Sequence, residues 1–460
     1  MSLPPSFSPG PTNPHRSAWL GAHANGLIWA VGNGLVSTTL ITFLAKDYGA
    51  TSFHVGLILA CPHLLGVLRL VAPPLVQSWP DRKRWTIAFF LLSGLCLLLL
   101  PLLSWPGVLA SQRQSLTALV ALWGTWHVWM YVGLVPFLSW LGDLGPRQER
   151  ATLFGVREAC LIFGTIVGTL LAATIAAWWN SWHAKEEQWI ALAGCAVAGG
   201  ILVIASVAPL LFMPHRPRSE WLQSTPSTKE MLSALVDRRF RPLLLFNIWF
   251  SLANGITGAA VGIFPYAVLG LSAPVMLYFA TYMRVGQVIG GPLAGRSLDR
   301  WGHRGAMATA QVIVACGLLF YLPATRNQWW WIAGAWTCWI AYAVLNVGLP
   351  SLTLRLSPGE NSPAYIAVIM AASSASFAIA SVLGGWLLDA LRTWSAQSST
   401  ADSSTAESSV AAIDPFAALF VVGFILRLGS AAWLLLLREG VGSDSDSESG
   451  SESGKQETTA

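Results

Sequence analysis

Charged residues are scarce in this sequence. Asp, Glu, Lys and Arg make up only 11% of the 460 residues, whereas 54% are apolar. Soluble domains carry about 25% charged residues, so the composition excludes an ordinary soluble protein. The formal net charge of +5 therefore does not indicate nucleic-acid binding. The apolar runs are long enough to cross a bilayer, which takes about 20 residues each, and we expect an all-α integral membrane protein.

Patterns for disulfides, metals and catalysis are also lacking. The six cysteines stand singly inside apolar runs, which excludes a disulfide framework and a cysteine-based metal site. No nucleophile–base pair is recognisable, so we expect no enzyme, no metal and no cofactor. A cleavable signal peptide is lacking too, because residues 1–17 are Pro-rich and Arg16 is their only charge.

The apolar runs predict twelve spans in two groups of six. Expected spans lie at about 18–45, 52–78, 85–105, 115–141, from 151 onward, and 188–213, and then at 242–269, 273–295, 306–323, 328–355, 363–391 and 413–437. The expected organisation is a disordered tail (1–17), an N-terminal half (18–213), a cytoplasmic linker (214–241), a C-terminal half (242–437) and a disordered, acidic, Ser-rich tail (438–460).

A short basic stretch separates the eighth and ninth expected spans. It runs from Gly295 to Arg304 with the pattern G-x-x-x-D-R-x-G-x-R. Glycine permits a tight turn with positive φ, and an acid among bases needs a partner such as an arginine or a helix N-terminus. A weaker copy, Asp81-Arg82, follows the second span. We expect a tight hairpin at a water interface.

The spacing of this stretch resembles the loop signature of the major facilitator superfamily, where it joins the second and third helices of each six-helix half. The resemblance covers about residues 18–438. It implies twelve helices in two pseudo-symmetric halves, transport of a small solute at the bilayer midplane by rocking of the halves, and a monomer. It also implies a conformational-gating role for Asp81, Arg82, Gly295, Asp299, Arg300, Gly302 and Arg304.

A second, less specific similarity concerns the region around the fourth and fifth spans. The segment from Pro136 to Arg157 is similar to the glycoside-pentoside-hexuronide cation symporters. The acids that those symporters carry on the second helix are missing here, where Arg69 and Pro73 stand. This argues against sodium coupling of their type.

An internal duplication is visible away from the loops. Asn33-Gly34 in the first span recurs as Asn254-Gly255 in the seventh, and the motif ending at Pro136 in the fourth recurs at Pro350 in the tenth. The duplication pairs His127 with Tyr342, and we expect the two to face each other across the pseudo-two-fold axis.

The loop charges predict the orientation. Lys and Arg concentrate in the loops that follow the second, fourth, sixth, eighth and tenth spans, while the opposite loops hold few. Basic loops stay on the cytoplasmic side. Both termini and the linker should therefore be cytoplasmic, in a cell membrane of the inner or plasma type, with the 393–412 loop outside.

Polar side chains gather in the first, fourth, seventh and tenth spans, which line the central cavity in the resembled family. Polar groups facing lipid are costly, so these should face a cavity. The residues that we expect to bind substrate are Asn33, His127, Asn254, Arg284, Gln287, Tyr342 and Asn346.

Three arginines within the expected spans lack an acid at the same depth. Arg69 and Arg427 lie closer to the cytoplasmic end and could extend to the interface, whereas Arg284 lies near the middle of its span. An arginine at mid-depth costs roughly 2.5–3.5 kcal/mol on insertion scales. Arg284 is therefore either solvated by water, amides and helix carbonyls in a structural role, or neutralised by the substrate. We expect it to bind an acidic group of the substrate, which would make the solute an organic anion.

Acidic residues are absent from the middle of every expected span. Proton-coupled transporters commonly use such a carboxylate, so His63 and His127 are the titratable groups left at depth, each also readable as a structural histidine. The missing acids and the degraded first loop copy leave a rival hypothesis open, a non-transporting sensor or scaffold of the same fold.

Overall fold

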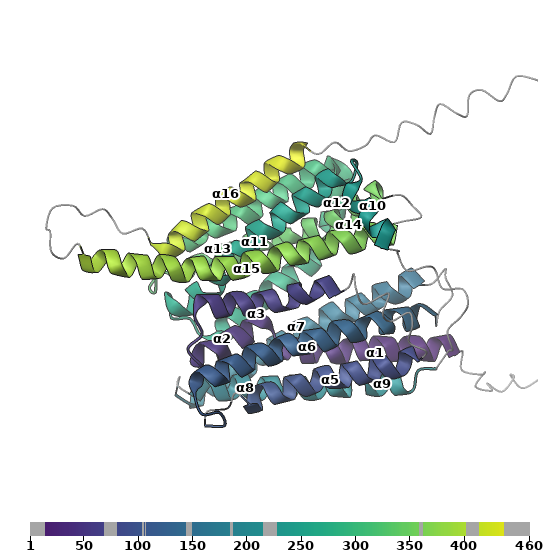
Figure 1. Cartoon of the computed structure of the whole chain (residues 1–460), viewed down its shortest axis with the longest axis horizontal. Coiled ribbons are helices and arrows are strands. Elements are labelled where there is room, and N and C mark those ends of the chain that lie inside the picture. Colours follow the sequence, from purple (N-terminus) through teal and green to yellow (C-terminus); the bar gives the residue numbers. More distant parts are fainter. Residues whose placement is uncertain are drawn as a thin grey trace, which may run out of the picture.

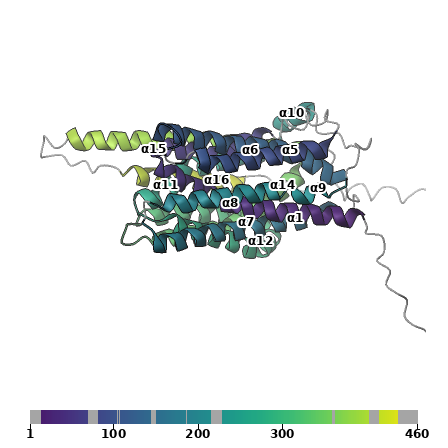
Figure 2. The same ribbon diagram turned by 90° about the horizontal axis from the view of Figure 1, so that it is seen from below.

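The computed structural model describes residues 14–68, 81–103, 105, 107–143, 150–184, 187–214, 228–357, 362–401 and 414–436. Within these ranges the regular structure is helical, with no strand. The helices run along one common direction and form two stacked groups, one from each half of the sequence (Figures 1 and 2).

The N-terminal half begins with a broken first span. Its two pieces meet at Ser37, whose hydroxyl accepts a hydrogen bond from the backbone N–H of Leu40 and so caps the second piece. The elements are α1 (Pro14–Leu35), α2 (Thr38–Asp47), α3 (Ser52–Leu64), η1 (Leu65–Val67), α5 (Arg82–Leu103), α6 (Gln112–Asp143), α7 (Arg150–Trp182), α8 (Gln188–Ala205) and α9 (Ala208–Leu211).

The C-terminal half follows after a short helix that precedes its first span. The fourth span of this half, the tenth of the chain, is broken by the 3₁₀ turn η5. The elements are α10 (Thr228–Val236), α11 (Arg241–Ala267), α12 (Ala273–Cys316), η4 (Gly317–Tyr321), α13 (Trp331–Cys338), η5 (Trp339–Ala341), α14 (Tyr342–Leu356), α15 (Ser362–Ala401) and α16 (Pro415–Leu436).

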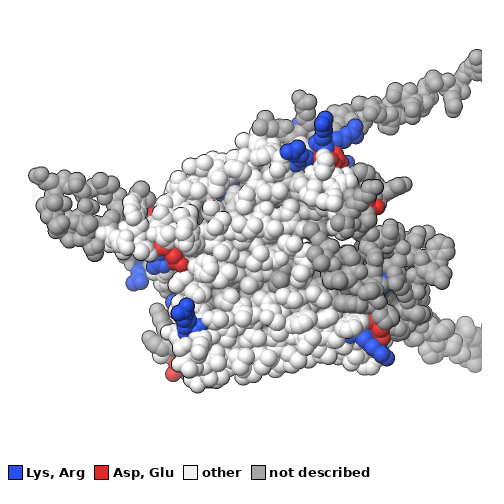
Figure 3. Space-filling model, viewed as in Figure 1, with Lys and Arg blue, Asp and Glu red and all other residues white. Residues whose placement is uncertain are grey.

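The expected all-α membrane architecture is confirmed. In the described residues, ten helices are long and apolar enough to cross a bilayer. One of them, Ala273–Tyr321, contains both the eighth and the ninth expected spans, and the shorter apolar helix Ser52–Leu64 is the described part of the second. On the face shown in Figure 3, charged side chains gather at the two ends of the bundle, with a nearly uncharged band between them.

The turn between the eighth and ninth spans is shorter than expected. Residues from Gly295 to Trp301 are helical, and the chain leaves helical geometry only at Gly302, with φ 73° and ψ 159°. Glycine is needed there because side chains disfavour positive φ. The predicted hairpin is therefore correct, but its loop is one residue and Gly295 belongs to a helix.

Glycines at equivalent places bring the first and fifth helices of each half together. A Cβ on Gly34 of α1 would lie 2.5 Å from the carbonyl oxygen of Thr165 in α7, and a Cβ on Gly255 of α11 would lie 2.5 Å from that of Phe377 in α15. Only glycine permits such backbone contact. The duplicated Asn-Gly pairs thus perform the same packing role in both halves.

Candidate functional site

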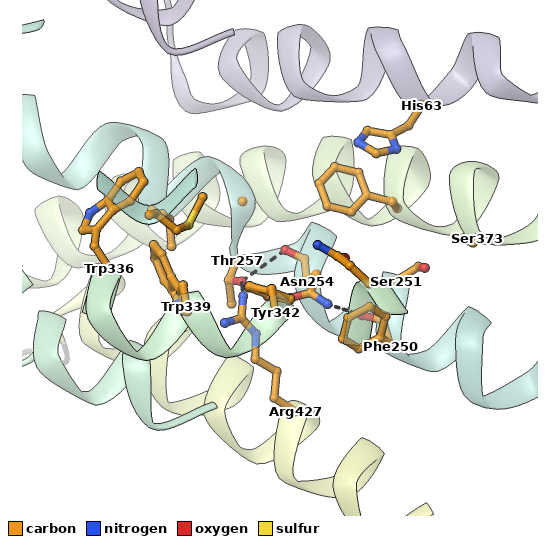
Figure 4. Close-up of a pocket in the computed structure, with 15 residues that line it drawn as sticks. His63, Phe250, Ser251, Asn254, Thr257, Trp336, Trp339, Tyr342, Ser373 and Arg427 are labelled. Carbon is orange, nitrogen blue, oxygen red and sulfur yellow. Dashed lines mark hydrogen bonds between the residues drawn. The ribbon is translucent and has the colours of Figure 1, made fainter. Parts of the chain in front are cut away.

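A cavity of about 430 Å³ lies in the C-terminal half. Side chains from most elements of that half line it, and His63 of α3 comes from the N-terminal half (Figure 4). The lining residues are His63, Phe250, Ser251, Asn254, Thr257, Gly258, Val261, Met283, Trp336, Trp339, Tyr342, Asn346, Ser373, Phe377 and Arg427. We call this cavity the central pocket.

Arg427 of α16 supplies the positive charge of the central pocket. Its side chain is only 4% exposed. Nη2 donates to Thr257 Oγ1 at 3.1 Å and Nη1 donates a long bond to the Val314 carbonyl at 3.5 Å, while Nε has no partner in the described structure. The hydroxyl of Thr257 in turn donates to the Asn254 carbonyl at 3.2 Å. The guanidinium is therefore held in place with donors left over.

A polar cluster behind Arg427 holds α16 against α12. The Gln311 amide donates to Ser430 Oγ at 2.8 Å and to the Arg427 carbonyl at 3.4 Å. Gln311 and Ser430 are fully buried, where an unpaired amide would cost about 1–3 kcal/mol. This cluster accounts for the one strongly polar residue of the ninth span.

Asn254 and Tyr342 form the second polar feature of the central pocket. The Tyr342 hydroxyl donates to Asn254 Oδ1, and Asn254 Nδ2 donates to the Phe250 carbonyl at 2.8 Å. Both side chains lie beside the Arg427 guanidinium (Figure 4). The seventh, tenth and twelfth spans thus meet at one polar point.

Aromatic rings form the remaining walls. The ring centroids of Trp336 and Trp339 lie 5.4 Å apart at one end of the pocket, and those of Phe250 and Tyr342 lie 6.4 Å apart. On the side facing the other half, His63 stacks on Phe377 with ring centroids 4.0 Å apart. This stack joins the two halves at the central pocket.

None of the residues that line the central pocket is acidic. The search for three or more His, Cys, Asp or Glu around one point also finds no metal site in the described residues. The pocket therefore combines one cation, amide and hydroxyl groups, and aromatic walls. Such a set suits an anionic ligand with an apolar body.

Three of the seven residues expected to bind substrate line the central pocket, namely Asn254, Tyr342 and Asn346. Gln287 stands behind its wall, where Nε2 donates to the Trp339 carbonyl at 3.2 Å. Arg284 is exposed and is not a lining residue, although Met283 beside it is. The arginine that lines the pocket is Arg427. It does not extend to the interface, as its place in the span would allow, because Thr257 holds its guanidinium inside the bundle.

The N-terminal counterparts lie elsewhere. Asn33 is half-buried in α1 and does not line the pocket. His127 is 5% exposed and packs between Trp123 and Trp126, at 4.7 and 4.2 Å, and neither ring nitrogen has a hydrogen-bond partner among the described residues. The expected pairing of His127 with Tyr342 across the pocket is not found.

The two loop copies differ in structure. Asp81 caps α5, since its carboxylate accepts from the Arg84 N–H at 3.1 Å and pairs with Arg84 Nε at 3.0 Å. Arg82 is buried. Asp299 and Arg300 are exposed, and Asp299 makes no hydrogen bond or ion pair with a described residue. Arg304 is partly buried just after the turn.

Sequence analysis missed a contact that anchors the second copy. His303 follows the turn, is 4% exposed, and its Nε2 lies 2.9 Å from Ser351 Oγ of α14. From the sequence alone, a histidine among basic loop residues is interpreted as one more solvent-exposed basic side chain. Its burial comes from the extended helix on each side of Gly302.

A carboxylate from α15 joins the two halves at the end of the bundle where α3 begins. Asp389 accepts hydrogen bonds from the backbone N–H groups of Ser52 at 3.0 Å and Phe53 at 2.9 Å, the first residues of α3. Ser381 Oγ donates to the Gly56 carbonyl at 3.1 Å. A carboxylate at a helix N-terminus is stabilised by free N–H groups and by the helix dipole. We call this contact the outer clamp.

Comparison with known proteins agrees with this architecture. The family model of the Major Facilitator Superfamily matches residues 19–283, more than half of the chain. No curated protein matches. Similar solved structures include a bacterial homologue of the human lysosomal transporter Spinster in an inward-facing, unoccupied conformation (14% identity, 93% of this chain and 98% of that chain, TM-score 0.66).

Two further structures share the fold. A mutant of the nucleoside transporter NupG is 12% identical over 92% of this chain and 100% of its own, with a TM-score of 0.68. A D-xylose-proton symporter is 15% identical over 92% and 97%, with a TM-score of 0.64. These structural similarities show the fold alone because the sequence identities are low. The family model, in contrast, matches the amino-acid sequence itself. The chain belongs to the major facilitator superfamily.

Proposed function

We propose that this membrane transporter carries a small organic anion by alternating access, and that Arg427 binds the acidic group of the solute. The observation that carries the proposal is a buried guanidinium with a spare donor and no acidic residue among the lining side chains. An uncompensated charge at membrane depth is costly. A carboxylate or phosphate would neutralise it and accept the unused N–H groups in a bidentate pair.

The position of the central pocket supports a transport role. His63 reaches it from the other half and stacks on Phe377, so a bound solute would contact both halves. Transporters of this kind move two rigid bundles about such a site. A solute that contacts both halves can bias their relative positions through its different affinity for each state.

The outer clamp supports an inward-facing conformation for this structure. Its contacts lie at the end of the molecule opposite the start of α1 and the end of α16 (Figure 1). Under the proposed topology, with both termini cytoplasmic in the cell membrane and a monomeric transporter, the clamp closes the outside. Opening outward would then require Asp389 to leave α3.

The test is uptake into liposomes that contain the purified protein. A panel of radiolabelled carboxylates, organic phosphates, neutral solutes and organic cations is compared in wild type, Arg427→Lys and Arg427→Gln. We expect wild-type uptake of at least one anion, partial activity in the lysine variant and a loss of at least 100-fold in the glutamine variant. Thermal unfolding checks that both variants fold.

Two results would contradict the proposal. Uptake restricted to cations, or normal anion uptake by folded Arg427→Gln, would exclude Arg427 as an anion-binding residue. Saturable binding of a solute with no uptake under any gradient would instead favour the rival hypothesis of a non-transporting sensor.

A further inference from the structure

A second cavity, of about 250 Å³, adjoins the central pocket. It is lined from α11, α14 and α15, and it shares Asn346 and Ser373 with the central pocket. Ser373 lies at the end of the central pocket away from Trp336 (Figure 4). The two cavities are thus neighbours that share part of their walls, and Arg427 lines the first of them.

The walls of the second cavity are aliphatic. They include Leu345, Leu349, Leu354, Ile366, Ile369 and Met370. No charged side chain is among its lining residues. Its surface therefore offers a solute dispersion contacts and burial from water, with no charge to pair.

Two of the four polar side chains that line the second cavity already have hydrogen-bond partners, and the other two, Asn346 and Ser373, are those shared with the central pocket. The Asn247 amide donates to the Ile369 carbonyl at 3.3 Å, and the Thr353 hydroxyl donates to the Leu349 carbonyl at 2.8 Å. A polar solute would gain little from groups that already have partners. Leu354 and Met370 line the cavity and are 53% and 46% exposed, so apolar surface remains to be covered.

We propose that the solute is an amphipathic anion, whose acidic group binds Arg427 and whose aliphatic chain lies in the second cavity. The inference rests on the proposed function and adds the class of solute. A charged head fits the cavity that holds the cation, and a chain of methylene groups fits the cavity whose walls are aliphatic. A short acid would leave the second cavity unused.

The proposal predicts a dependence on chain length. Each methylene buried from water strengthens binding by about fourfold. Acids with longer chains should therefore bind more tightly until the second cavity is full. Filling that cavity with a larger side chain should remove this gain without removing binding of a short acid.

Equilibrium dialysis of purified full-length protein with labelled butanoate, octanoate and dodecanoate tests this directly. We expect wild type to bind dodecanoate at least 50-fold more tightly than butanoate. Met370→Trp, and separately Leu354→Phe, should reduce that ratio at least tenfold while butanoate affinity stays within threefold. Ile379→Trp is the matched control on α15, because Ile379 is exposed and lines neither cavity; it should leave the ratio unchanged.

The outcomes separate this inference from the proposed function. Equal affinity for butanoate and dodecanoate, with binding lost in Arg427→Gln, would overturn the amphipathic assignment and leave the anion site intact. A loss of affinity for all three acids alike in both filling variants would also overturn it. If wild type binds none of the acids, and no other anion in the uptake panel is transported, both proposals fail.

Discussion

The two halves are built alike but hold different interiors. In both, a glycine of the first helix touches the backbone of the fifth. In the N-terminal half, the third and sixth helices meet through apolar contacts, where a Cβ on Gly94 would lie 2.5 Å from Ile204. In the C-terminal half, the equivalent helices are joined by the Gln311–Ser430 hydrogen bond, which leads to Arg427.

The same contrast holds for the fourth helix of each half. His127 is enclosed by Trp123 and Trp126, whereas Tyr342 lines the central pocket and donates to Asn254. The glycine contacts between the first and fifth helices occur in both halves, whereas the hydrogen-bonded pair of Tyr342 and Asn254 occurs only in the half that contains the central pocket. The asymmetry between the halves therefore locates the site better than the symmetry does.

The largest expected effect concerns what the halves share. Gly34→Val and Gly255→Val should each prevent folding or lower the unfolding temperature by more than about 10 °C, because a side chain would collide with backbone on the fifth helix. Gly194→Val and Gly291→Val are the controls, since a Cβ at either position meets nothing within 4 Å. Tolerance of Gly255→Val with intolerance of Gly34→Val would break the structural equivalence.

Removal of the polar cluster should affect the C-terminal half alone. Gln311→Leu leaves Ser430 and the Arg427 carbonyl without the amide, which should cost about 1–3 kcal/mol of stability. Because the backbone of α16 at Arg427 then loses its bond to α12, the guanidinium is positioned less firmly and we expect anion affinity to fall tenfold or more. Ser93→Ala on α5 is a control, since Ser93 is buried but bonds only within its own helix. Unchanged anion affinity in Gln311→Leu would separate the cluster from the site.

The outer clamp joins the two halves, and Asp389→Ala should shift the molecule toward the outward-open state. The alanine cannot accept from Ser52 and Phe53, so α3 loses its cap, worth about 1 kcal/mol. That corresponds to a shift of about fivefold in the population. Accessibility of a cysteine placed at Val261, which lines the central pocket, to an external, membrane-impermeant thiol reagent measures it. No change in labelling rate would contradict the clamp.

The two loop copies give a smaller contrast. Asp299→Asn should reduce transport more than Asp81→Asn, because asparagine also caps a helix well and Asp81 acts as a cap on α5. Uptake rates at matched protein levels provide the measurement. Equal, negligible effects would remove Asp299 from the gating device.

The smallest expected effect is one of pH at the start of the C-terminal half. Burial alone would raise the pKa of Asp237, but hydrogen bonds from Tyr365 and from the backbone N–H groups of Arg239 and Phe240 lower the pKa overall. A depressed folded-state pKa stabilises the protein above the unfolded value, and the gain is lost as pH falls below about 4. Tyr365→Phe should reduce this acid sensitivity of the unfolding temperature, and an identical pH profile would refute it.

The sequence predicted the fold because the length of each apolar run depends on the thickness of the bilayer, and a run of about 20 apolar residues therefore marks a span. It also predicted Asn254, Tyr342 and Asn346 as pocket residues, since polar side chains that face lipid are costly and therefore turn toward the interior of the bundle. The length of the eighth span was misjudged because the basic residues from Arg296 to Arg300 continue the helix until Gly302 breaks it.

Arg427 could not be recognised from its depth along the span. Its guanidinium is held by Thr257 and its backbone carbonyl by Gln311 and Ser430, and Thr257 and Gln311 lie on other helices far away in the sequence. Arg284 lies nearer the middle of its span and has no such partners among the described residues. Hydropathy therefore identifies which arginines lie within spans, but only the tertiary packing determines which one lines a cavity.

The most direct test of the account is to compare Arg427→Gln with Arg284→Gln for the same transported anion in the same liposomes. Arg427 lines the central pocket and Arg284 does not. We predict that Arg427→Gln raises the dissociation constant at least 100-fold, while Arg284→Gln changes it less than threefold. The opposite order in two folded variants would contradict the assignment of the anion site to the central pocket.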